Sequence, residues 1–385
     1  MIRIAIDLTA LLPRPTGVDN YMTQLLVHLG KVDHEHRYKI FVNYEDRHVF
    51  RDRLPDNFSV LPVSVRPRAA RLLFQQIGLP ALAAGWGADV VHSPSFIMPW
   101  YRGSRRHVLT VYDMTSFSLP DCHIPLRRSA LYRAAVLHSI RHADLVTVPS
   151  YSTQEDILAL APQVSRNRIR VISPGIGEEF HPSRHPIERE SPAGVRLPPS
   201  YILYVGTIEP RKNLIRLVEC YRRLIATDHL AEHLVLVGQL GWGYESLLAQ
   251  LESAELRGRV HLTGYVSQQD LPAIYRGARL FVYPSLQEGF GFPPLEAMAC
   301  GVPTISSQSS SLTENLQGAA ELVPPDDAEA LTDAMRRLLW DESLRAKRRE
   351  QGLARAALFS WRSAAEHTKL CYVSATAGER PGKAS

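Results

Sequence analysis

The chain has 385 residues, of which 45% are hydrophobic and 22% are charged, a balance typical of a soluble globular protein. This length exceeds what one hydrophobic core usually organises, so we expect two domains or a large barrel. No apolar run approaches the roughly 20 residues of a membrane-spanning helix. The four cysteines stand singly, without a CxxC pair, which argues against a disulfide framework and against a zinc site.

The net charge of +5 is concentrated in one part of the chain. Residues 66–141 contain ten arginines and only three acidic residues. A basic surface of this kind can meet nucleic acid, an anionic membrane or a phosphorylated substrate. It is equally consistent with a solvated, arginine-rich surface, and the composition does not separate these interpretations.

The first half of the chain alternates short apolar runs with amphipathic segments. The opening residues, MIRIAIDLTA, are typical of a strand and not of a secretion signal, so we expect a cytoplasmic protein. Alternation of this kind predicts βαβ units around a parallel sheet. We expect strands at 3–7, 38–42, 90–92, 107–111 and 145–148, and helices near 18–30, 70–84, 127–142 and 152–160.

The same alternation restarts after a stretch rich in proline. Residues 177–199 contain five prolines and little apolar pattern, which indicates a linker. The second set of elements therefore forms a second sheet. We expect its strands at 201–206, 233–238, 260–264, 279–285, 304–306 and 321–323, and its helices from 213 and near 244–254, 269–276 and 294–300.

These patterns predict an α/β protein with two Rossmann-like, doubly wound domains that face a central cleft. In such sheets ligands bind beyond the carboxyl ends of the strands. The expected order is an N-terminal domain over 1–176, the linker, a second domain over 200–357, a helix over 358–375 that packs back toward the N-terminal domain, and a disordered tail over 376–385.

Two cations follow the first strand of the second half. That strand ends at Gly206 and Thr207, and Arg211 and Lys212 precede a helix for which Asn213 suits the N-cap position. Arginine binds a phosphate through two hydrogen bonds, lysine adds a compact charge, and a helix N-terminus favours anions. The motif predicts a diphosphate site, although a surface charge pair fits the stretch taken alone.

The stretch EGFGFPPLE places Glu288 before a glycine-rich loop and Glu296 in the helix that follows. Gly289 and Gly291 allow the backbone to approach a ligand closely. A carboxylate accepts two hydrogen bonds from a vicinal diol, which ribose and hexose rings both offer. We expect Glu296 to bind ribose and Glu288 to bind a sugar, while ordinary first-turn stabilisation of the helix also accounts for Glu296.

Together these motifs resemble the GT4 family of retaining glycosyltransferases, which have the GT-B fold. The resemblance covers nearly the whole chain and includes Gly17 in RPTGVDNY. It implies that Glu296 holds the nucleotide ribose and that Glu288 contacts the donor sugar. It also implies that Arg211 and Lys212 bind the diphosphate and stabilise the leaving group.

The resemblance assigns further residues to the substrate. It implies that Gly17 approaches the donor phosphate, that Val266 contacts the base, and that Gly206, Thr207, Gly289, Phe290 and Gly291 line the substrate site. Three positions depart from the family pattern. Tyr112 and Asp113 stand where many relatives have histidine-aspartate, so the histidine's role falls to Asp113 with backbone carbonyls, or to Tyr112. Thr207 stands where many relatives have an arginine, and Asp19 where they have a glycine.

The resemblance and the residues together predict a hexosyltransferase of surface polysaccharide synthesis, close to enzymes of O-antigen and exopolysaccharide assembly. The favoured donor is GDP-mannose, with UDP- and dTDP-sugars as alternatives. A nucleotide-sugar epimerase or phosphorylase is the second class of protein that fits the pattern, and a two-domain solute-binding protein is the third. Metal-dependent transferases commonly hold their metal with an Asp-x-Asp pair. None ends an expected strand here, so we expect no metal and no cofactor. The resemblance implies that transfer retains the anomeric configuration.

The expected partners are a nucleotide sugar, a lipid-linked oligosaccharide acceptor and the anionic inner face of the cytoplasmic membrane, with no nucleic acid. The expected helix at 70–84 carries a broad apolar stripe, which is more often core than membrane anchor. Arginines near an anionic surface nevertheless add about 1 kcal/mol each to binding. We therefore expect Arg102, Arg105 and Arg106 to contribute to peripheral membrane binding.

Overall fold

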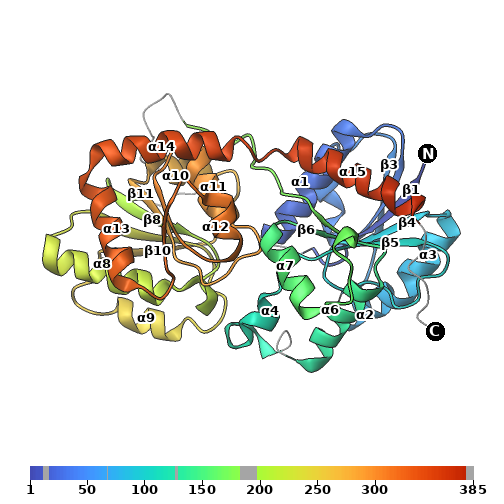
Figure 1. Cartoon of the computed structure of the whole chain (residues 1–385), viewed down its shortest axis with the longest axis horizontal. Helices are drawn as coiled ribbons and strands as arrows, with labels where there is room; N and C mark the ends of the chain where they lie inside the picture. Colours follow the sequence, from blue (N-terminus) through green and yellow to red (C-terminus); the bar gives the residue numbers. More distant parts are fainter. Residues whose placement is uncertain (12–16, 67, 126–128, 183–196, 379–385) are drawn as a thin grey trace. The chain divides into compact units, whose positions relative to one another are not determined.

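The computed structural model describes residues 1–11, 17–66, 68–125, 129–182 and 197–378. Most of the expected linker, and residues 379–385 of the expected tail, lie outside the described residues. The chain divides into two compact units, and each is described by itself. Unit 1 comprises Met1–Phe117, Pro125–Gly175 and Ser360–Ser385, and unit 2 comprises Ser118–Ile124 and Ile176–Phe359 (Figure 1).

Unit 1 contains a seven-stranded parallel sheet with the order β3-β2-β1-β4-β5-β6-β7. All five strands expected in the first half are present. The sequence analysis missed β3, which contains a proline, and β7, which has only three residues, and both lie at the edges of the sheet where the apolar pattern is weakest. The strands are β1 (Arg3–Asp7), β2 (Arg37–Asn43), β3 (Phe58–Val63), β4 (Val90–Ser93), β5 (Arg106–Thr110), β6 (Leu145–Val148) and β7 (Ile169–Val171).

The helices of unit 1 follow the expected segments with one difference. The segment expected as a single helix over 70–84 is interrupted by a π-helical turn, η2. Pro80 follows this turn and has no N–H to donate, so the regular hydrogen-bond ladder cannot continue through it. The helices are α1 (Gly17–Val32), α2 (Arg68–Leu73), η2 (Phe74–Gly78), α3 (Leu79–Trp86), α4 (Thr115–Ser118), α6 (Ala130–His142), α7 (Tyr151–Leu160) and α15 (Trp361–Ala377).

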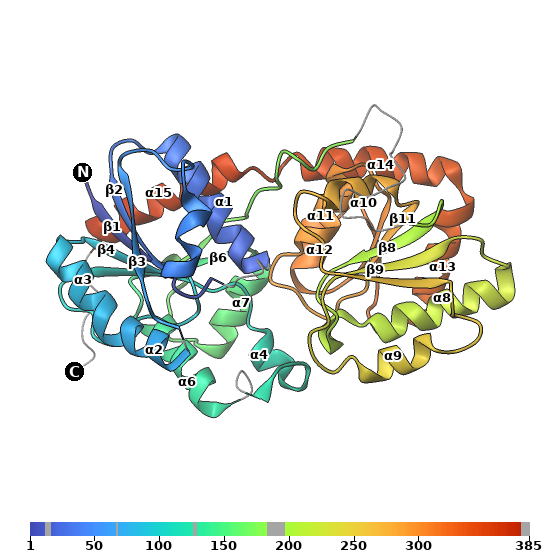
Figure 2. The same cartoon turned by 180° about the vertical axis from the view of Figure 1, so that it is seen from behind.

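The last helix, α15, packs along α1, and the two lie side by side in both views (Figures 1 and 2). Its Tyr372 hydroxyl hydrogen-bonds Nδ1 of His92 at 2.8 Å, and Nε2 of that ring lies 2.8 Å from the Thr110 hydroxyl. Burial lowers the pKa of His92 to about 3, so the ring stays neutral. His92 therefore ties α15 to the sheet and has a structural role.

Two arginines expected on a basic surface are instead largely buried. The side chains of Arg102 and Arg106 are 25% and 18% exposed, and both contact the Asp144 carboxylate, at 3.6 and 3.2 Å. Their charge is thus partly neutralised inside unit 1. Their pairing with Asp144 could not be predicted from the local pattern, because Asp144 is separated from them in sequence. The expectation that Arg102, Arg105 and Arg106 contribute to membrane binding stays a prediction.

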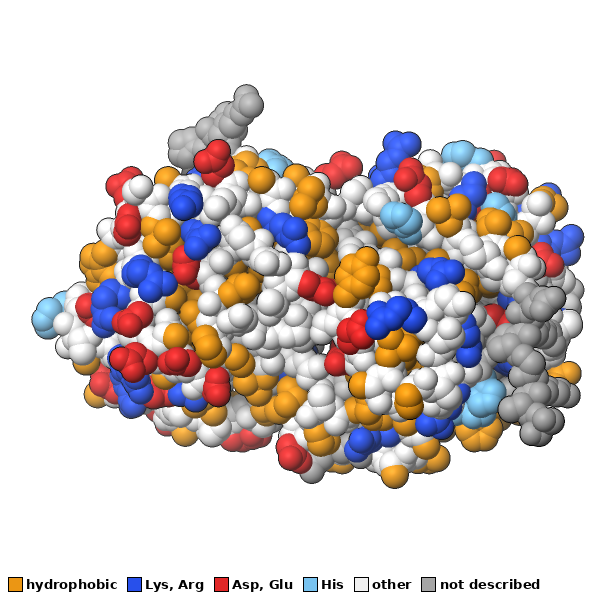
Figure 3. All heavy atoms as spheres, in the orientation of Figure 1, with side chains coloured by type: hydrophobic (Ala, Val, Ile, Leu, Met, Phe, Trp, Pro, Cys, Tyr) orange, Lys and Arg blue, Asp and Glu red, His pale blue; other side chains and the backbone are white. Residues whose placement is uncertain are grey.

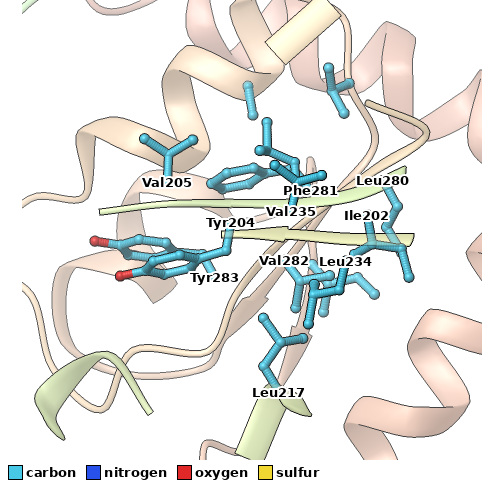
Figure 4. Packing of buried hydrophobic residues seen from close by; sticks show 14 of the residues in the cluster. Ile202, Tyr204, Val205, Leu217, Leu234, Val235, Leu280, Phe281, Val282 and Tyr283 are labelled. Atoms are coloured by element: carbon cyan, nitrogen blue, oxygen red, sulfur yellow. The ribbon is translucent and has the colours of Figure 1, made fainter. Parts of the chain in front are cut away.

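Unit 2 contains a six-stranded parallel sheet with the order β10-β9-β8-β11-β12-β13. Its central strands are apolar on both faces, as expected for a sheet covered by helices (Figure 4). All six strands match the expected segments. They are β8 (Tyr201–Val205), β9 (His233–Val237), β10 (Val260–Gly264), β11 (Leu280–Tyr283), β12 (Thr304–Ser307) and β13 (Glu321–Val323).

The helices of unit 2 cover both faces of this sheet. Asn213 precedes α8 but does not cap it in the expected way. It adopts a left-handed conformation with φ 57°, and its side-chain amide donates to Pro325 O at 2.8 Å. The helices are α8 (Leu214–Asp228), α9 (Glu245–Leu251), α10 (Leu271–Gly277), α11 (Phe292–Ala299), α12 (Ser310–Leu316), α13 (Ala328–Trp340) and α14 (Glu342–Ala356).

The surface of unit 2 mixes charges of both signs. On the face drawn in Figure 3, basic and acidic side chains are interspersed over this unit. This agrees with the balanced charge of the second half of the chain. Among the described residues, no helix combines the length and the apolar character that crossing a bilayer requires.

Candidate active site

The candidate site in unit 2 lies where the strand order reverses. The chain runs from β8 outward through β9 and β10 and then returns to place β11 on the other side of β8. Because the two strands are parallel neighbours, the loops that follow them leave the sheet at the same edge. This is the position at which doubly wound sheets bind their ligands.

The two loops are joined by hydrogen bonds to one backbone carbonyl. Arg211 O accepts from the Leu286 N–H at 2.9 Å and from the Ser285 hydroxyl at 3.2 Å. The loop after β8 begins with Gly206, whose N–H donates to Val237 O at 2.9 Å, and with the half-buried Thr207. The contacts hold the two predicted motifs against each other.

Arg211, Lys212 and Glu288 form a set of ion pairs that we call the cation clamp. Lys212 Nζ lies 2.6 Å from Glu288 Oε1 and donates to the Tyr283 hydroxyl at 2.8 Å. Arg211 Nη1 lies 2.7 Å from the second oxygen of Glu288, and its Nη2 lies 2.7 Å from Glu209 Oε1. Glu288 thus bridges both cations through its two oxygens.

Burial and charge act in opposite directions on these groups. Burial alone would raise the pKa of Glu288, but Arg211 and Lys212 outweigh it and hold that pKa at about 2. Burial and the neighbouring Arg211 lower the pKa of Lys212. The clamp therefore contains a permanently ionised carboxylate beside a lysine that binds its proton less firmly than an exposed one.

The loop after Glu288 is held by α12. The Glu288 N–H donates to Ser310 Oγ at 2.9 Å, and Ser311 Oγ donates to Glu288 O at 2.8 Å. The side-chain amide of Asn315 donates to the buried Phe290 O at 2.8 Å. These bonds fix the backbone of the loop, as a site that presents its amides to a ligand requires.

The second glycine of the loop is required by its conformation. Gly291 has φ 93°, and a Cβ at this position would lie 2.5 Å from Leu312 Cδ2. Any other residue there would have a strained backbone, and its Cβ would push against the Leu312 side chain of α12. Gly289, earlier in the loop, is half-buried.

Glu296 lies in α11 and is only 6% exposed. The Tyr275 hydroxyl donates to its Oε2 at 2.8 Å, and no cation pairs with it among the described residues. Burial therefore raises its pKa to about 7. Gln268 lies close to this carboxyl group, and the predicted base-contacting residue, Val266, is buried two positions earlier.

Two of the predicted residues belong to unit 1. Gly17 is the first residue of α1 and is exposed, and the residues just before it lie outside the described part. The Asp113 carboxylate accepts a hydrogen bond from the Thr115 N–H at 2.9 Å, at the start of α4. The structure brings Arg211, Lys212 and Glu288 together in unit 2, and it describes Gly17 and Asp113 within their own unit.

The sequence analysis missed four polar residues of the site. Tyr283 and Ser285 touch Glu288, Glu209 touches Arg211, and Tyr275 touches Glu296. Tyr283 ends β11 and Ser285 follows it, just before the glycine-rich loop, and this position in the sequence could have identified both. Nothing in the sequence near Tyr275 distinguishes it from a core residue.

The donor set of the site suits an anion. The clamp presents an arginine and a lysine next to backbone amides. Within the described residues, His, Cys, Asp and Glu side chains form no group of three or more suited to a metal ion.

Two family models match the chain. The model described as "Glycosyltransferase Family 4" matches residues 15–180, and the model described as "Glycosyl transferases group 1" matches residues 188–355. Together they span most of both expected domains.

Known proteins agree with these matches. The O-antigen chain mannosyltransferase B of Escherichia coli is 33% identical over 292 residues, which is 74% of this chain and 74% of that one. The sucrose-phosphate synthase of Thermosynechococcus elongatus has the same fold, with a TM-score of 0.80 and 23% identity over 98% of this chain and 100% of that one. Anabaena HepE, solved with UDP and glucose, superposes with a TM-score of 0.75. It is 17% identical, and the match covers 97% of this chain and 100% of that one. The chain therefore belongs to the GT4 family of glycosyltransferases and has the GT-B fold.

Proposed function

We propose that the protein is a retaining, metal-independent hexosyltransferase that moves mannose from GDP-mannose to a lipid-linked glycan in surface polysaccharide synthesis. One observation carries this proposal: Arg211 and Lys212 converge at the switch point of unit 2 and share a single carboxylate, Glu288. A site with two convergent cations and a sugar-binding carboxylate suits a nucleotide diphosphate sugar.

The clamp supplies the charge that transfer requires. When the bond between the sugar and the diphosphate breaks, negative charge grows on the phosphate oxygen. Preorganised cations stabilise that charge more than they stabilise the bound donor, and this difference accelerates the reaction. Arg211 and Lys212 thereby take the part that a metal ion plays in other transferases.

Glu288 neutralises the clamp before the donor arrives. The donor diphosphate competes with this carboxylate for Arg211 and Lys212. We propose that Glu288 then turns to the donor sugar and accepts hydrogen bonds from its hydroxyl groups, while Glu296 accepts from the ribose diol. Gly289, Phe290 and Gly291 offer backbone groups between these two positions.

The choice of mannose and GDP is supported by the relatives that are mannosyltransferases of O-antigen synthesis. HepE was solved with UDP, so UDP- and dTDP-sugars remain the alternative donors. An epimerase is the other class, and it differs because it forms product without an acceptor. Asp113 and Gly17 are proposed to serve the transferred sugar and the donor phosphate from unit 1.

We propose that the enzyme acts at a membrane surface, because lipid-linked acceptors are held there. Four apolar side chains of unit 1 are between 61% and 73% exposed: Leu73, Ile77, Trp100 and Tyr101. The Trp100 N–H donates to Gln76 Oε1, so this loop lies against η2. Basic and apolar side chains lie together over the part of unit 1 that carries α2 and α6 (Figure 3). Such a surface suits an anionic bilayer.

A screen of nucleotide sugars tests the proposed function directly. We expect GDP-mannose to raise the melting temperature most, because it fills both the ribose and the diphosphate positions. Turnover of the best binder should need an acceptor and should persist in EDTA. Preference for a UDP- or dTDP-sugar would replace the donor, product without acceptor would indicate an epimerase, and rescue of EDTA-treated enzyme by manganese would contradict the metal-independent mechanism.

Removal of either cation should impair the chemical step. We expect Arg211→Ala and Lys212→Ala each to lower kcat by roughly 10²- to 10³-fold, because the stabilised charge develops in the transition state. Arg216→Ala is the matched control, since Arg216 lies on α8 and pairs with Glu219 at the surface. Steady-state kinetics decides: a raised KM with normal kcat in both clamp variants would show that the pair binds only the ground state.

Titration calorimetry with GDP and UDP should distinguish the roles of the two glutamates by their effects on nucleotide affinity. Glu296→Gln should weaken nucleotide binding about tenfold, whereas Glu288→Gln should bind at least as well as wild type, because its carboxylate competes with the diphosphate. A ribose diol favours ionised Glu296, so its pKa falls on binding. Wild-type affinity should therefore drop as pH falls below about 7, by up to about tenfold per unit.

Glu296→Gln provides the control for the titration of the nucleotide itself, which is common to both proteins. Subtracting its pH profile should leave only the contribution of Glu296. Identical profiles for the two proteins would show that Glu296 does not bind the ribose, and the opposite ranking of the two glutamate variants would exchange their roles.

Membrane binding should depend on the exposed apolar side chains. We expect wild type to co-sediment with vesicles that contain phosphatidylglycerol but not with pure phosphatidylcholine, and salt to weaken the binding. Leu73→Glu combined with Ile77→Glu should reduce it about tenfold or more. Leu358→Glu is the control, a leucine of unit 2 that is 69% exposed. Equal binding to both vesicle types, or to neither, would contradict the proposed surface.

A further inference from the structure

The buried side chain of Tyr283 touches both Lys212 and Glu288. Its hydroxyl oxygen accepts from Lys212 Nζ at 2.8 Å and donates to Glu288 Oε1 at 3.0 Å. The ammonium and the carboxylate are also paired at 2.6 Å, so the three groups form a closed triangle. Lysine has three N–H donors, and the described residues occupy two of those of Lys212.

The position of this hydroxyl is fixed by ring packing. The Tyr283 ring stacks on Tyr204 with centroids 5.8 Å apart and planes 12° apart, and on Phe281 with centroids 6.1 Å apart. Figure 4 shows the Tyr204 and Tyr283 rings stacked with their hydroxyl groups at the same end. Tyr283 is 1% exposed, so its hydroxyl cannot turn away from Lys212 when other groups of the site move.

We propose that Tyr283 is a positioning residue that keeps Lys212 protonated and directed at the donor diphosphate when Glu288 turns to the sugar. This inference rests on the proposed function. Once Glu288 leaves, the buried ammonium loses its carboxylate acceptor, and Tyr283 remains as an acceptor at the same place. The tyrosine proton, no longer donated to Glu288, then becomes available to an oxygen of the donor.

The charged groups around Lys212 explain why it needs this support. Burial and the adjacent Arg211 lower the pKa of Lys212, whereas Glu288 and Glu209 raise it. Burial raises the pKa of Tyr283 well above its ordinary value, as it does for the stacked Tyr204, so both hydroxyls keep their protons. Removing the Tyr283 oxygen leaves the ammonium with one acceptor fewer, which favours the neutral amine.

The test is the pH dependence of GDP binding, measured by titration calorimetry between pH 6.5 and 10 on the full chain. For Tyr283→Phe, we expect wild-type affinity near pH 6.5 and a loss of affinity at high pH that begins about one pH unit lower than in wild type. Tyr204→Phe is the matched control, because its hydroxyl donates to Thr207 O at 3.3 Å and not to Lys212. It should follow the wild-type curve.

Superposed curves for wild type and Tyr283→Phe, or equal shifts in both tyrosine variants, would overturn the inference. Glu288→Ala gives a second measurement that does not depend on folding of the phenylalanine variant, and unlike glutamine it leaves no side-chain acceptor at this position. Of the two side-chain acceptors of Lys212 described above, Tyr283 then remains, so GDP should still bind at pH 7.5, and loss of that binding would also overturn the inference. Failure of wild type to bind any nucleoside diphosphate would instead refute the proposed function.

Discussion

The burial of two cations side by side is the constraint on which the candidate site depends. Arg211 and Lys212 are consecutive residues, their side chains are only 13% and 9% exposed, and like charges in such a place repel each other. A buried charge is costly unless it is paired and hydrogen-bonded. Glu288 meets this requirement by placing one oxygen on each cation. The site is therefore held together by one carboxylate that pairs with both cations.

The sheet determines that these residues meet at all. Lys212 and Glu288 lie 76 positions apart, yet each follows one of two neighbouring parallel strands. The reversal of strand order leaves the space beyond β8 and β11 open to loops instead of crossover helices. Hydrogen bonds from α12 then fix the loop after β11, so the backbone of Glu288 is held in place next to the two cations.

The regular elements could be predicted because both sheets are buried and their strands are continuous apolar runs. The edge strands β3 and β7 lack that pattern, and the π-helical turn depends on hydrogen bonding that residue type alone does not reveal. The same limit applies to the site. Charged residues next to glycine and proline marked Arg211, Lys212 and Glu288 as candidates for the site. The family resemblance supplied their expected roles. Their contacts with Tyr283 and Glu209, and the pairing of Arg102 with Asp144, depend on which loops the fold brings together.

Glu288, in the glycine-rich loop, and Glu296, in the helix that follows it, show how different surroundings give identical side chains different pKa values. Glu288 and Glu296 are both buried, and burial alone favours the neutral acid in each. Two cations hold the pKa of Glu288 at about 2, whereas Glu296 meets the uncharged side chains of Tyr275 and Gln268, and its pKa is about 7. Glu288 is thus always an anion and serves as the counter-ion of both cations. With a pKa of about 7, Glu296 is only partly ionised near neutral pH, so any hydrogen-bond donor that approaches it would increase the fraction that is ionised.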